Sequence, residues 1–355
     1  MPLTRRHWLQ SATAGIVAAP VMGGADTRKA PIKIGQIGVG HAHATKLSVY
    51  RASNDYEVVG IVEPDDQLWA QAQSRPAFAG LQRLQRDDLL SLPGLQAVLI
   101  ETRVRDLLAN AKVCVDAGLH VHIDKPAGES LADLQAILDT ATRKQLLVQM
   151  GYMYRYNPGI VLLREFLKNG WLGELFELHT VMSKVVGKAD RTALAEYPGG
   201  SMFELGCHII DLVVAILGAP ERVHAFPRHS SSENDSLLDN MLAVFEYPKA
   251  TATIRSSVVE IDGGARRHLT LCGTGGTFHL QPLDQPVAKI TLAKPSGPYK
   301  AGTTEVALPK YVRYVDDARD MAEVIRGEKS TDFPPAHDLA VQRSVLQACG
   351  LKTEQ

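Results

Sequence analysis

The sequence predicts an α/β protein of two domains: an N-terminal domain on a parallel sheet, residues 31–150, and a C-terminal α+β domain on a mostly antiparallel open sheet, residues 151–351. Three observations predict this class. Up to residue 150, short β-rich runs alternate with amphipathic stretches, as in parallel sheets with crossover helices. After residue 151, several strand candidates alternate apolar with polar residues, as in a sheet with one wetted face. A chain of 355 residues, 45% of them hydrophobic, can also bury the cores of two domains.

The first 25 residues have the features of an export signal. Arg5 and Arg6 precede an apolar, Ala-rich run that ends near Ala25, and the first acidic residue is Asp26. This order is typical of a secretory signal peptide, and the run is too short to span a bilayer. The paired arginines resemble the twin-arginine signal. We expect residues 1–25 to be a removed twin-arginine signal peptide, and the protein to be periplasmic or extracytoplasmic without a membrane anchor after processing. The alternative is a basic N-terminus that is not removed.

The charge and the cysteines exclude several classes of protein. The formal net charge is -1, so the chain lacks the basic excess with which proteins bind nucleic acid or anionic membranes. Its four cysteines are widely spaced, without a C-x-x-C pair. We therefore expect buried thiols, and neither a zinc cage nor a disulfide framework. These cysteines are Cys114, Cys207, Cys272 and Cys349.

A glycine turn follows the first strand candidate, "IKIGQIG". Gly38 and Gly40 stand between this strand and a helix-like segment, the context of a dinucleotide-binding turn. Gly38 would allow the tight turn, and Gly40 would let the backbone approach a pyrophosphate. His43 replaces the usual third glycine and either widens the helix-strand spacing or points at the cofactor. Glu63 ends the second strand, "YEVVGIV", at the spacing of an acid that binds the adenosine ribose, which favours NAD over NADP. The alternative is a glycine turn that binds no dinucleotide.

Asp124 and Lys125 follow another strand candidate, "LHVHI", which ends at Ile123. Ligands of open α/β sheets bind at the carboxyl ends of the strands, so these side chains are candidates for a binding site. Taken alone, this position favours a lysine on the surface.

A carboxylate and an imidazole lie close together in the second domain. If a helix runs from Met202 to Leu217, then Glu204, His208 and Asp211 share one face. Such a set can bind a polyol and move its hydroxyl proton. The alternatives are metal binding, which has few other ligand candidates nearby, and a histidine that only stabilises the fold. The strand candidates after this helix include "NMLAVFEY", "TATIRSSVVEI" and "KITLAK", and two amphipathic helices end the chain.

Four ordered motifs carry a resemblance to a known family. They are "IGVGHAHA", "HVHIDKPAGESL", "GYMYRYNP" and "GGSMFELGCHIID", and the resemblance that they carry runs from about Ile32 to Leu351. Together they resemble the Gfo/Idh/MocA oxidoreductases. The resemblance implies a Rossmann domain for residues 31–150, and a second domain whose open sheet makes the protein a dimer or tetramer.

The resemblance also assigns roles to residues. It implies that Lys125 lies beside the nicotinamide and the reacting hydroxyl, that His208 is the catalytic acid/base, and that Glu204 replaces the usual aspartate. No metal is expected. The implied catalytic residues are Lys125, His208 and Glu204; the cofactor-binding residues are Gly38, Val39, Gly40, His41, His43, Glu63, Thr102, Asp124 and Lys125; the substrate-binding residues are Tyr154, Arg155, Glu204 and Asp211.

The leading functional hypothesis is an oxidoreductase that transfers a hydride between a secondary hydroxyl of a sugar or cyclitol and tightly bound NAD, with NADP as the weaker choice. One alternative is a redox-neutral glycosidase or lyase, which would oxidise a sugar hydroxyl only transiently. Others are paired oxidation and reduction of two sugars, and a non-catalytic sugar- or cofactor-binding protein.

Overall fold

The computed structural model describes residues 29–353, so the expected signal peptide lies outside the described residues. Residues from Pro31 onward cluster as one unit. Among the described residues, none of the helices combines the length and the apolar character that crossing a membrane requires.

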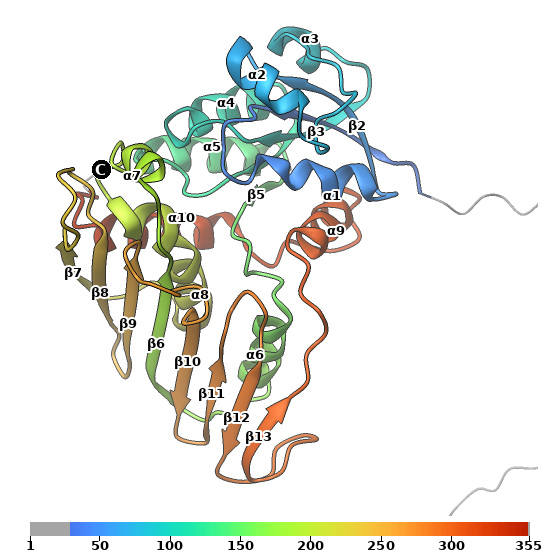
Figure 1. The fold of residues 1–355 in the computed structure, drawn as a ribbon. Coiled ribbons are helices and arrows are strands. Elements are labelled where there is room, and N and C mark those ends of the chain that lie inside the picture. The colour runs from blue at the N-terminus through green and yellow to red at the C-terminus, as the bar shows by residue number, and fades with distance from the viewer. Residues whose placement is uncertain (1–28, 354–355) are drawn as a thin grey trace, which may run out of the picture. The chain divides into compact units, whose positions relative to one another are not determined.

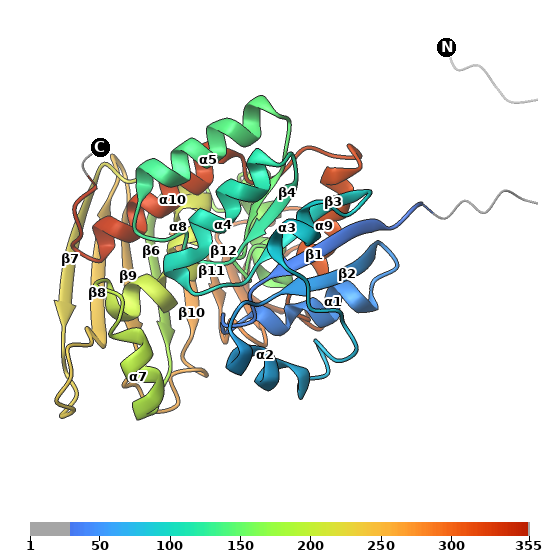
Figure 2. The same ribbon diagram turned by 90° about the horizontal axis from the view of Figure 1, so that it is seen from above.

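The first sheet confirms the parallel α/β prediction. Its order, within residues 29–353, is β2-β1-β3-β4-β5, and all its pairings are parallel (Figure 1). The strands are β1 (Ile32–Ile37), β2 (Tyr56–Val62), β3 (Leu95–Ile100), β4 (His120–Ile123) and β5 (Val148–Met150). The connecting helices are α1 (Leu47–Ala52, after a 3-10 turn at Ala44–Lys46), α2 (Asp66–Gln73), α3 (Arg86–Leu90), α4 (Val104–Asp116) and α5 (Leu131–Arg143). Figure 2 shows α4 and α5 together beside this sheet.

One helix near the C-terminus packs on the first sheet. Ala318 and Met321 of α9 (Val315–Ile325) join the buried cluster that contains Tyr50 and Tyr56, and the Tyr56 hydroxyl donates to the Ala318 carbonyl at 2.6 Å. The predicted boundary at residue 150 therefore separates the two sheets but assigns α9 to the wrong domain. The reason is that the apolar face of α9 completes the core of the first domain.

The second sheet is mostly antiparallel, as predicted. Its order among the described residues is β13-β12-β11-β10-β6-β9-β8-β7, and β6 and β9 form its one parallel pair. The strands are β6 (Leu175–Ser183), β7 (Arg222–Arg228), β8 (Asn240–Glu246), β9 (Thr251–Ser257), β10 (His268–Gly273), β11 (Gly276–Leu280), β12 (Ala288–Leu292) and β13 (Gly302–Val306). The two edge strands, β7 and β13, do not appear among the strand candidates of the sequence. None of their residues is fully buried, so neither strand carries the strongly apolar inward face of the inner strands.

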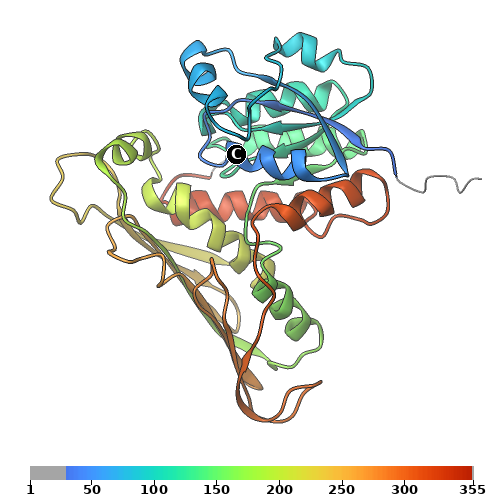
Figure 3. The same cartoon turned by 45° about the vertical axis from the view of Figure 1, so that its right-hand side comes forward.

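Helices cover one face of the second sheet. They include α6 (Pro158–Lys168), α8 (Cys207–Leu217) and α10 (Pro335–Ala348), and the short α7 (Lys188–Leu194) lies between β6 and α8 in the chain. Figure 3 shows this sheet close to edge-on, with α6, α8 and α10 on the same side. Leu178, Ile254, Leu271 and Phe278 are fully buried between sheet and helices, and each buried side chain of this kind contributes roughly 1.5–3 kcal/mol.

The helix predicted from Met202 begins differently. Residues Met202–Gly206 form a π-helical turn, and α8 starts only at Cys207. A π turn holds more residues than an α turn, so it rotates Glu204 away from the stripe that an α-helix would give. The regular helix predicted from Met202 is therefore wrong in its first turn, and Glu204 pairs with Lys125 whereas Asp211 pairs with Arg155.

Candidate active site

The glycine turn has the geometry that a dinucleotide needs. Gly38 has φ +89°, and a Cβ there would lie 2.7 Å from the Thr102 Cγ2 and backbone nitrogen. Gly40 is different, because a Cβ there would meet only Leu68 Cδ1 at 3.5 Å. Gly38 is thus required by the fold, whereas the space beside Gly40 is open for a ligand.

A cavity of about 710 Å³ extends from this turn along the carboxyl ends of the strands. Of the predicted cofactor-binding residues, Gly38, Gly40, Glu63 and Thr102 line it, whereas Val39, His41, His43, Asp124 and Lys125 are not among its lining residues. The Glu63 carboxylate accepts from the backbone nitrogens of Val39 and Asp65, each at 3.0 Å. Each carboxylate oxygen has a second lone pair, so Glu63 is fixed in place and can still accept from a ribose hydroxyl. The turn, the cavity and Glu63 therefore fit NAD.

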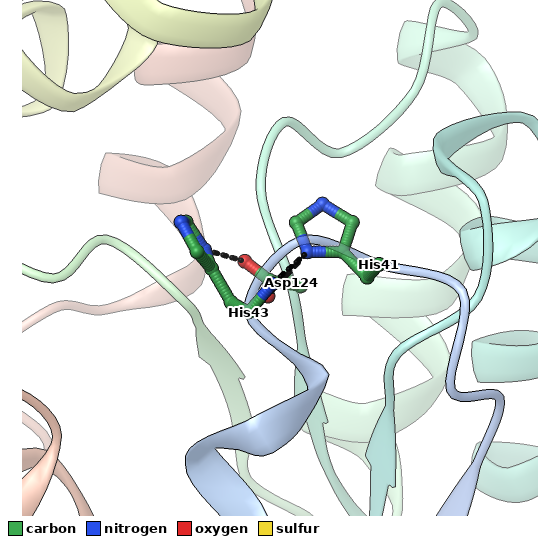
Figure 4. A group of neighbouring side chains, drawn as sticks. All are labelled: His41, His43 and Asp124. Atoms are coloured by element: carbon green, nitrogen blue, oxygen red, sulfur yellow. Dashed lines mark hydrogen bonds and ion pairs between the residues drawn. The ribbon is translucent and has the colours of Figure 1, made fainter. Parts of the chain in front are cut away.

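Asp124 is the centre of a buried network beside the turn (Figure 4). Its Oδ2 lies 2.8 Å from His41 Nδ1 and 3.0 Å from Lys46 Nζ. Its Oδ1 lies 3.3 Å from His43 Nδ1 and accepts from the Lys125 backbone nitrogen at 2.7 Å. Burial opposes ionisation, but His41, Lys46 and His43 outweigh it and hold the pKa of Asp124 well below its usual range. The carboxylate therefore positions the glycine turn and Lys125 rather than binding substrate.

Lys46 belongs to the same network, although the sequence does not mark it. Its ammonium is fully buried, 3.0 Å from Glu101 Oε1, and 5.0 Å from the centre of the Tyr314 ring. Burial favours the neutral amine, but Asp124 and Glu101 raise the pKa of Lys46, so it is a cation. His41, His43 and Asp124 lie close enough to ligate a metal. The Lys46 ammonium already neutralises the Asp124 carboxylate. We therefore infer that this cluster positions the glycine turn and Lys125 and does not bind a metal.

Lys125 and Glu204, two of the catalytic residues that the resemblance implies, form a buried ion pair. Lys125 Nζ donates to Glu204 Oε1 at 2.9 Å and to the Glu204 backbone carbonyl at 2.6 Å. Burial would raise the pKa of Glu204, but Lys125 outweighs it and lowers that pKa to about 2. The pKa of Lys125 is raised, because Glu204 outweighs the opposite effect of burial. Glu204 Oε2 is buried without a hydrogen-bond partner among the described residues, so it is available to a substrate hydroxyl.

His208 is a buried, neutral imidazole among the rings of His43, Tyr152 and Tyr154. Its ring centre lies 5.7 Å from that of His43 and 5.9 Å from that of Tyr154. Its Nδ1 is buried and has no hydrogen-bond partner in the part of the chain that the structure describes. Burial, and then Lys125, lower the pKa of His208 well below its usual range. A neutral imidazole with a free nitrogen is able to accept a proton.

Two predicted substrate ligands lie elsewhere. Arg155 Nη2 lies 2.7 Å from Asp211 Oδ1 and 2.5 Å from Asp338 Oδ1, and all three side chains are buried. His337 Nε2 lies 3.1 Å from the same Asp211 oxygen. Arg155 and Asp211 therefore neutralise each other and join α8 to α10, and we correct their assignment from substrate binding to a structural ion pair. Tyr154 remains at the site, where its hydroxyl donates to Asp284 Oδ1 at 2.9 Å.

Comparison with known proteins assigns this architecture. The family model described as an oxidoreductase family with an NAD-binding Rossmann fold matches residues 32–152. The model of the GFO/IDH/MocA C-terminal domain matches residues 160–279. The chain belongs to the Gfo/Idh/MocA family of oxidoreductases. Its first sheet is accordingly an NAD-binding Rossmann domain, as the glycine turn and Glu63 predict.

Curated members of the Gfo/Idh/MocA family are distant from this chain. It is 24% identical over 164 residues to trans-1,2-dihydrobenzene-1,2-diol dehydrogenase of Sus scrofa, a match that covers 46% of this chain and 48% of the relative. The chain therefore spans about half the length of the first curated relatives it matches. It is 24% identical over 262 residues to the uncharacterized oxidoreductase YhhX of Escherichia coli, covering 72% of each.

Solved structures show the same fold. UDP-N-acetylglucosamine 3-dehydrogenase from Acidithiobacillus ferrooxidans has a TM-score of 0.74 at 20% identity, covering 90% of this chain and 96% of that one. An oxidoreductase from Agrobacterium radiobacter, solved with NAD+, L-tartaric acid and magnesium, has a TM-score of 0.77 at 16% identity, with the same coverage. At these identities the similarity establishes the fold alone.

Proposed function

We propose that this protein transfers a hydride reversibly between a secondary hydroxyl of a sugar or cyclitol and NAD. The observation that carries the proposal is the neutral, buried His208, whose ring centre lies 5.7 Å from that of His43 at the end of the glycine turn and whose pKa the Lys125 charge lowers. A proton acceptor and a fixed positive charge are the two groups that oxidation of a carbinol requires.

The roles of the residues follow from their charges. NAD supplies the hydride acceptor at C4 of its nicotinamide. As the C–H bond of the carbinol breaks with its electron pair, the hydroxyl proton passes to the free ring nitrogen of His208, and a carbonyl forms. Lys125 donates a hydrogen bond to the oxygen while negative charge develops on it. Glu204 Oε2 accepts from a neighbouring hydroxyl and orients the ring. A positioned acid/base contributes typically about 10²- to 10⁴-fold to the rate.

The first experiment measures bound cofactor. The protein is purified without added nucleotide and denatured, and released dinucleotide is quantified by mass spectrometry. The NAD-loaded protein is then mixed with a panel of polyols and sugars, and absorbance at 340 nm is followed. We expect NADH to form with at least one of them, and Lys125→Met and His208→Asn to abolish its formation while retaining NAD. Full turnover in both variants would contradict the proposal.

We also propose twin-arginine export and tight cofactor binding, on the evidence of Arg5 and Arg6. Free NAD is scarce outside the cytoplasm, so an exported enzyme would keep its cofactor bound and regenerate it on the same chain. This consequence favours redox-neutral glycoside cleavage or paired sugar chemistry as the second candidate function. Glycoside cleavage without net NADH formation would support it. Fusion of residues 1–30 to a reporter that requires twin-arginine export tests the signal, with Arg5→Lys/Arg6→Lys as the control.

The assembly proposed for the protein is a homodimer or homotetramer through the helix-free face of the second sheet. A mass close to that of one chain in light scattering would contradict it.

A further inference from the structure

We infer that the substrate of this site carries a carboxylate, which Arg267 and Arg313 bind beside the reacting hydroxyl. The substrate class is then a hydroxy acid or sugar acid rather than a neutral sugar. This inference rests on the proposed function, because it concerns the same site.

Two arginines share one carboxylate at the wall of the site. Arg267 Nη1 lies 2.6 Å from Asp284 Oδ2, and Arg267 Nε donates to the Ser183 carbonyl at 3.0 Å. Arg313 donates to the other Asp284 oxygen, Oδ1, which also accepts from the Tyr154 hydroxyl at 2.9 Å. A guanidinium has five N–H donors, so both arginines keep donors for a second anion.

Two tyrosines lie between these arginines and the acid/base. The Tyr154 ring contacts Asp284 through its hydroxyl and lies 5.9 Å from the centre of His208. Arg313 is followed by Tyr314, whose ring centre lies 5.9 Å from that of His43. The charge of Arg267 is also one of the smaller contributions, after burial and Lys125, that lower the pKa of His208. Tyr154 and Tyr314 thus connect the arginines to the two histidines.

The backbone at Tyr314 supports a functional role for this segment. Tyr314 has φ +70°, in the left-handed region that non-glycine residues rarely adopt. Such conformations persist where the surroundings impose them, and they concentrate at ligand sites. Here the conformation directs Arg313 to Asp284 while the Tyr314 ring covers Lys46.

The charges around the substrate side do not balance. Lys125 pairs with Glu204, whereas Arg267 and Arg313 share the one carboxylate of Asp284, so the two arginines carry one net positive charge. Lys184 has no ion-pair partner within 4.0 Å among residues 29–353, and its charge acts on Glu204 after that of Lys125. Arg267 and Lys125 are largely buried, with side-chain exposures of 11% and 1%.

The Arg313 side chain is 41% exposed and that of Arg267 only 11%, so solvent screens part of this net positive charge and an anion bound to the arginines would offset the rest. The planar guanidinium groups already hold the two oxygens of Asp284, and this fork geometry matches a carboxylate. A carboxylate of the substrate would therefore complete the charge balance and fix the position of the neighbouring carbinol against His208.

Binding to NAD-loaded protein tests the inference independently of turnover. The probes are three matched pairs: D-glucuronate and D-glucose, D-gluconate and D-glucitol, and L-tartrate and L-threitol. Calorimetry should give tighter binding of at least one acid than of its neutral partner. Arg267→Gln or Arg313→Gln should weaken binding of that acid about 10- to 100-fold, the range for one charge-assisted hydrogen-bonded contact. Binding of neutral partners should change less than about threefold, since it lacks that contact.

Controls separate binding from folding. Arg222→Gln removes the same charge from the exposed strand β7, where Arg222 pairs with Glu246, and should leave acid binding unchanged. Arg267→Lys keeps the charge but loses the bidentate geometry of the guanidinium group. It should therefore give an intermediate affinity for the acid if the unfolding temperature is retained.

Three outcomes would overturn the inference. No acid binds more tightly than its neutral partner, both arginine variants weaken binding of acids and neutral sugars equally, or glucose 6-phosphate binds more tightly than every acid. Acid binding without NADH formation would instead contradict the proposed hydride transfer and leave the carboxylate inference standing.

Discussion

Lys125 and Glu204 are joined twice, because the Lys125 ammonium donates both to the Glu204 side chain at 2.9 Å and to its backbone carbonyl at 2.6 Å. The pair connects the carboxyl end of β4 to the π-helical turn before α8. It therefore fixes the distance between the Rossmann domain and the helix that carries His208.

Removing the Glu204 charge should destabilise the protein in a pH-dependent way. Glu204→Gln leaves the buried Lys125 without its counter-ion, which typically costs about 3–5 kcal/mol. The pKa of Glu204 in the folded protein, about 2, is lower than its ordinary value of 4.5. Ionised Glu204 therefore stabilises the fold above about pH 4.5, and this stability is lost as the pH falls toward 2.

Urea unfolding at pH 7 and at pH 3 measures this prediction. The difference between wild type and Glu204→Gln should be large at pH 7 and smaller at pH 3. Glu196→Gln is the control, because Glu196 pairs with Arg105 at the surface, where an ion pair contributes at most about 1 kcal/mol. An equal effect of the two substitutions would contradict the role of the Lys125–Glu204 pair.

The rate of carbinol oxidation should not fall at mildly acidic pH. Because burial and Lys125 keep the pKa of His208 well below its usual range, the imidazole is neutral and able to accept a proton at pH 6 as well as at pH 8. We expect log kcat for carbinol oxidation to be flat between these values. An acid limb with an apparent pKa at or above 6.5 would show that His208 is not the base or that its environment differs. His208→Asn should lose about 10²-fold or more in kcat, and His224→Asn on the exposed strand β7 should change nothing.

The two glycines of the turn should respond differently to alanine. Gly38→Ala places a Cβ 2.7 Å from Thr102 at a positive φ, so it should lower the unfolding temperature of the protein even without cofactor. Gly40→Ala meets only open space and Leu68, so the apo protein should keep its stability while the Kd for NAD rises. Thermal unfolding with and without NAD distinguishes the two. Equal loss of stability would mean that Gly40 also serves the fold.

Asp211 should matter for stability and not for substrate affinity. Asp211→Asn removes one partner of the buried Arg155, with an expected loss of about 3–5 kcal/mol. Burial raises the pKa of Asp338 against the influence of Arg155, whereas Arg155 outweighs burial and lowers the pKa of Asp211. Asp338→Asn should therefore cost less than Asp211→Asn. In both variants the KM for substrate, measured where the protein is folded, should stay at the wild-type value. A tenfold increase of KM in Asp211→Asn would show that Asp211 contributes to substrate binding after all.

Local sequence patterns were sufficient to predict the α/β fold class and the NAD-binding part of the first domain. The first two parallel strands, Gly38, Gly40 and Glu63 lie within about thirty residues of sequence, and their spacing determines their geometry. Lys125 and His208 came from two separate motifs, and only the family resemblance placed them at one site.

The other residues of the site depend on tertiary contacts that no spacing records. Lys46 looks like a helix-surface lysine until the fold encloses it with Asp124 and Glu101. Arg267 and Arg313 come from segments 46 positions apart and meet only at Asp284. Arg155 and Asp211 were assigned to substrate by their motifs, because the sequence did not show that they pair with each other.

The position of α9 also has a consequence during synthesis. Tyr50 and Tyr56 of the Rossmann domain complete their packing against residues 318–322. When only the first 150 residues have emerged from the ribosome, all five strands of the first sheet have been synthesised. The hydrophobic core of the nucleotide-binding domain is then still incomplete, because α9 is missing. Stable binding of dinucleotide should therefore require α9. A chain truncated before Val315 should be released from the ribosome without bound dinucleotide.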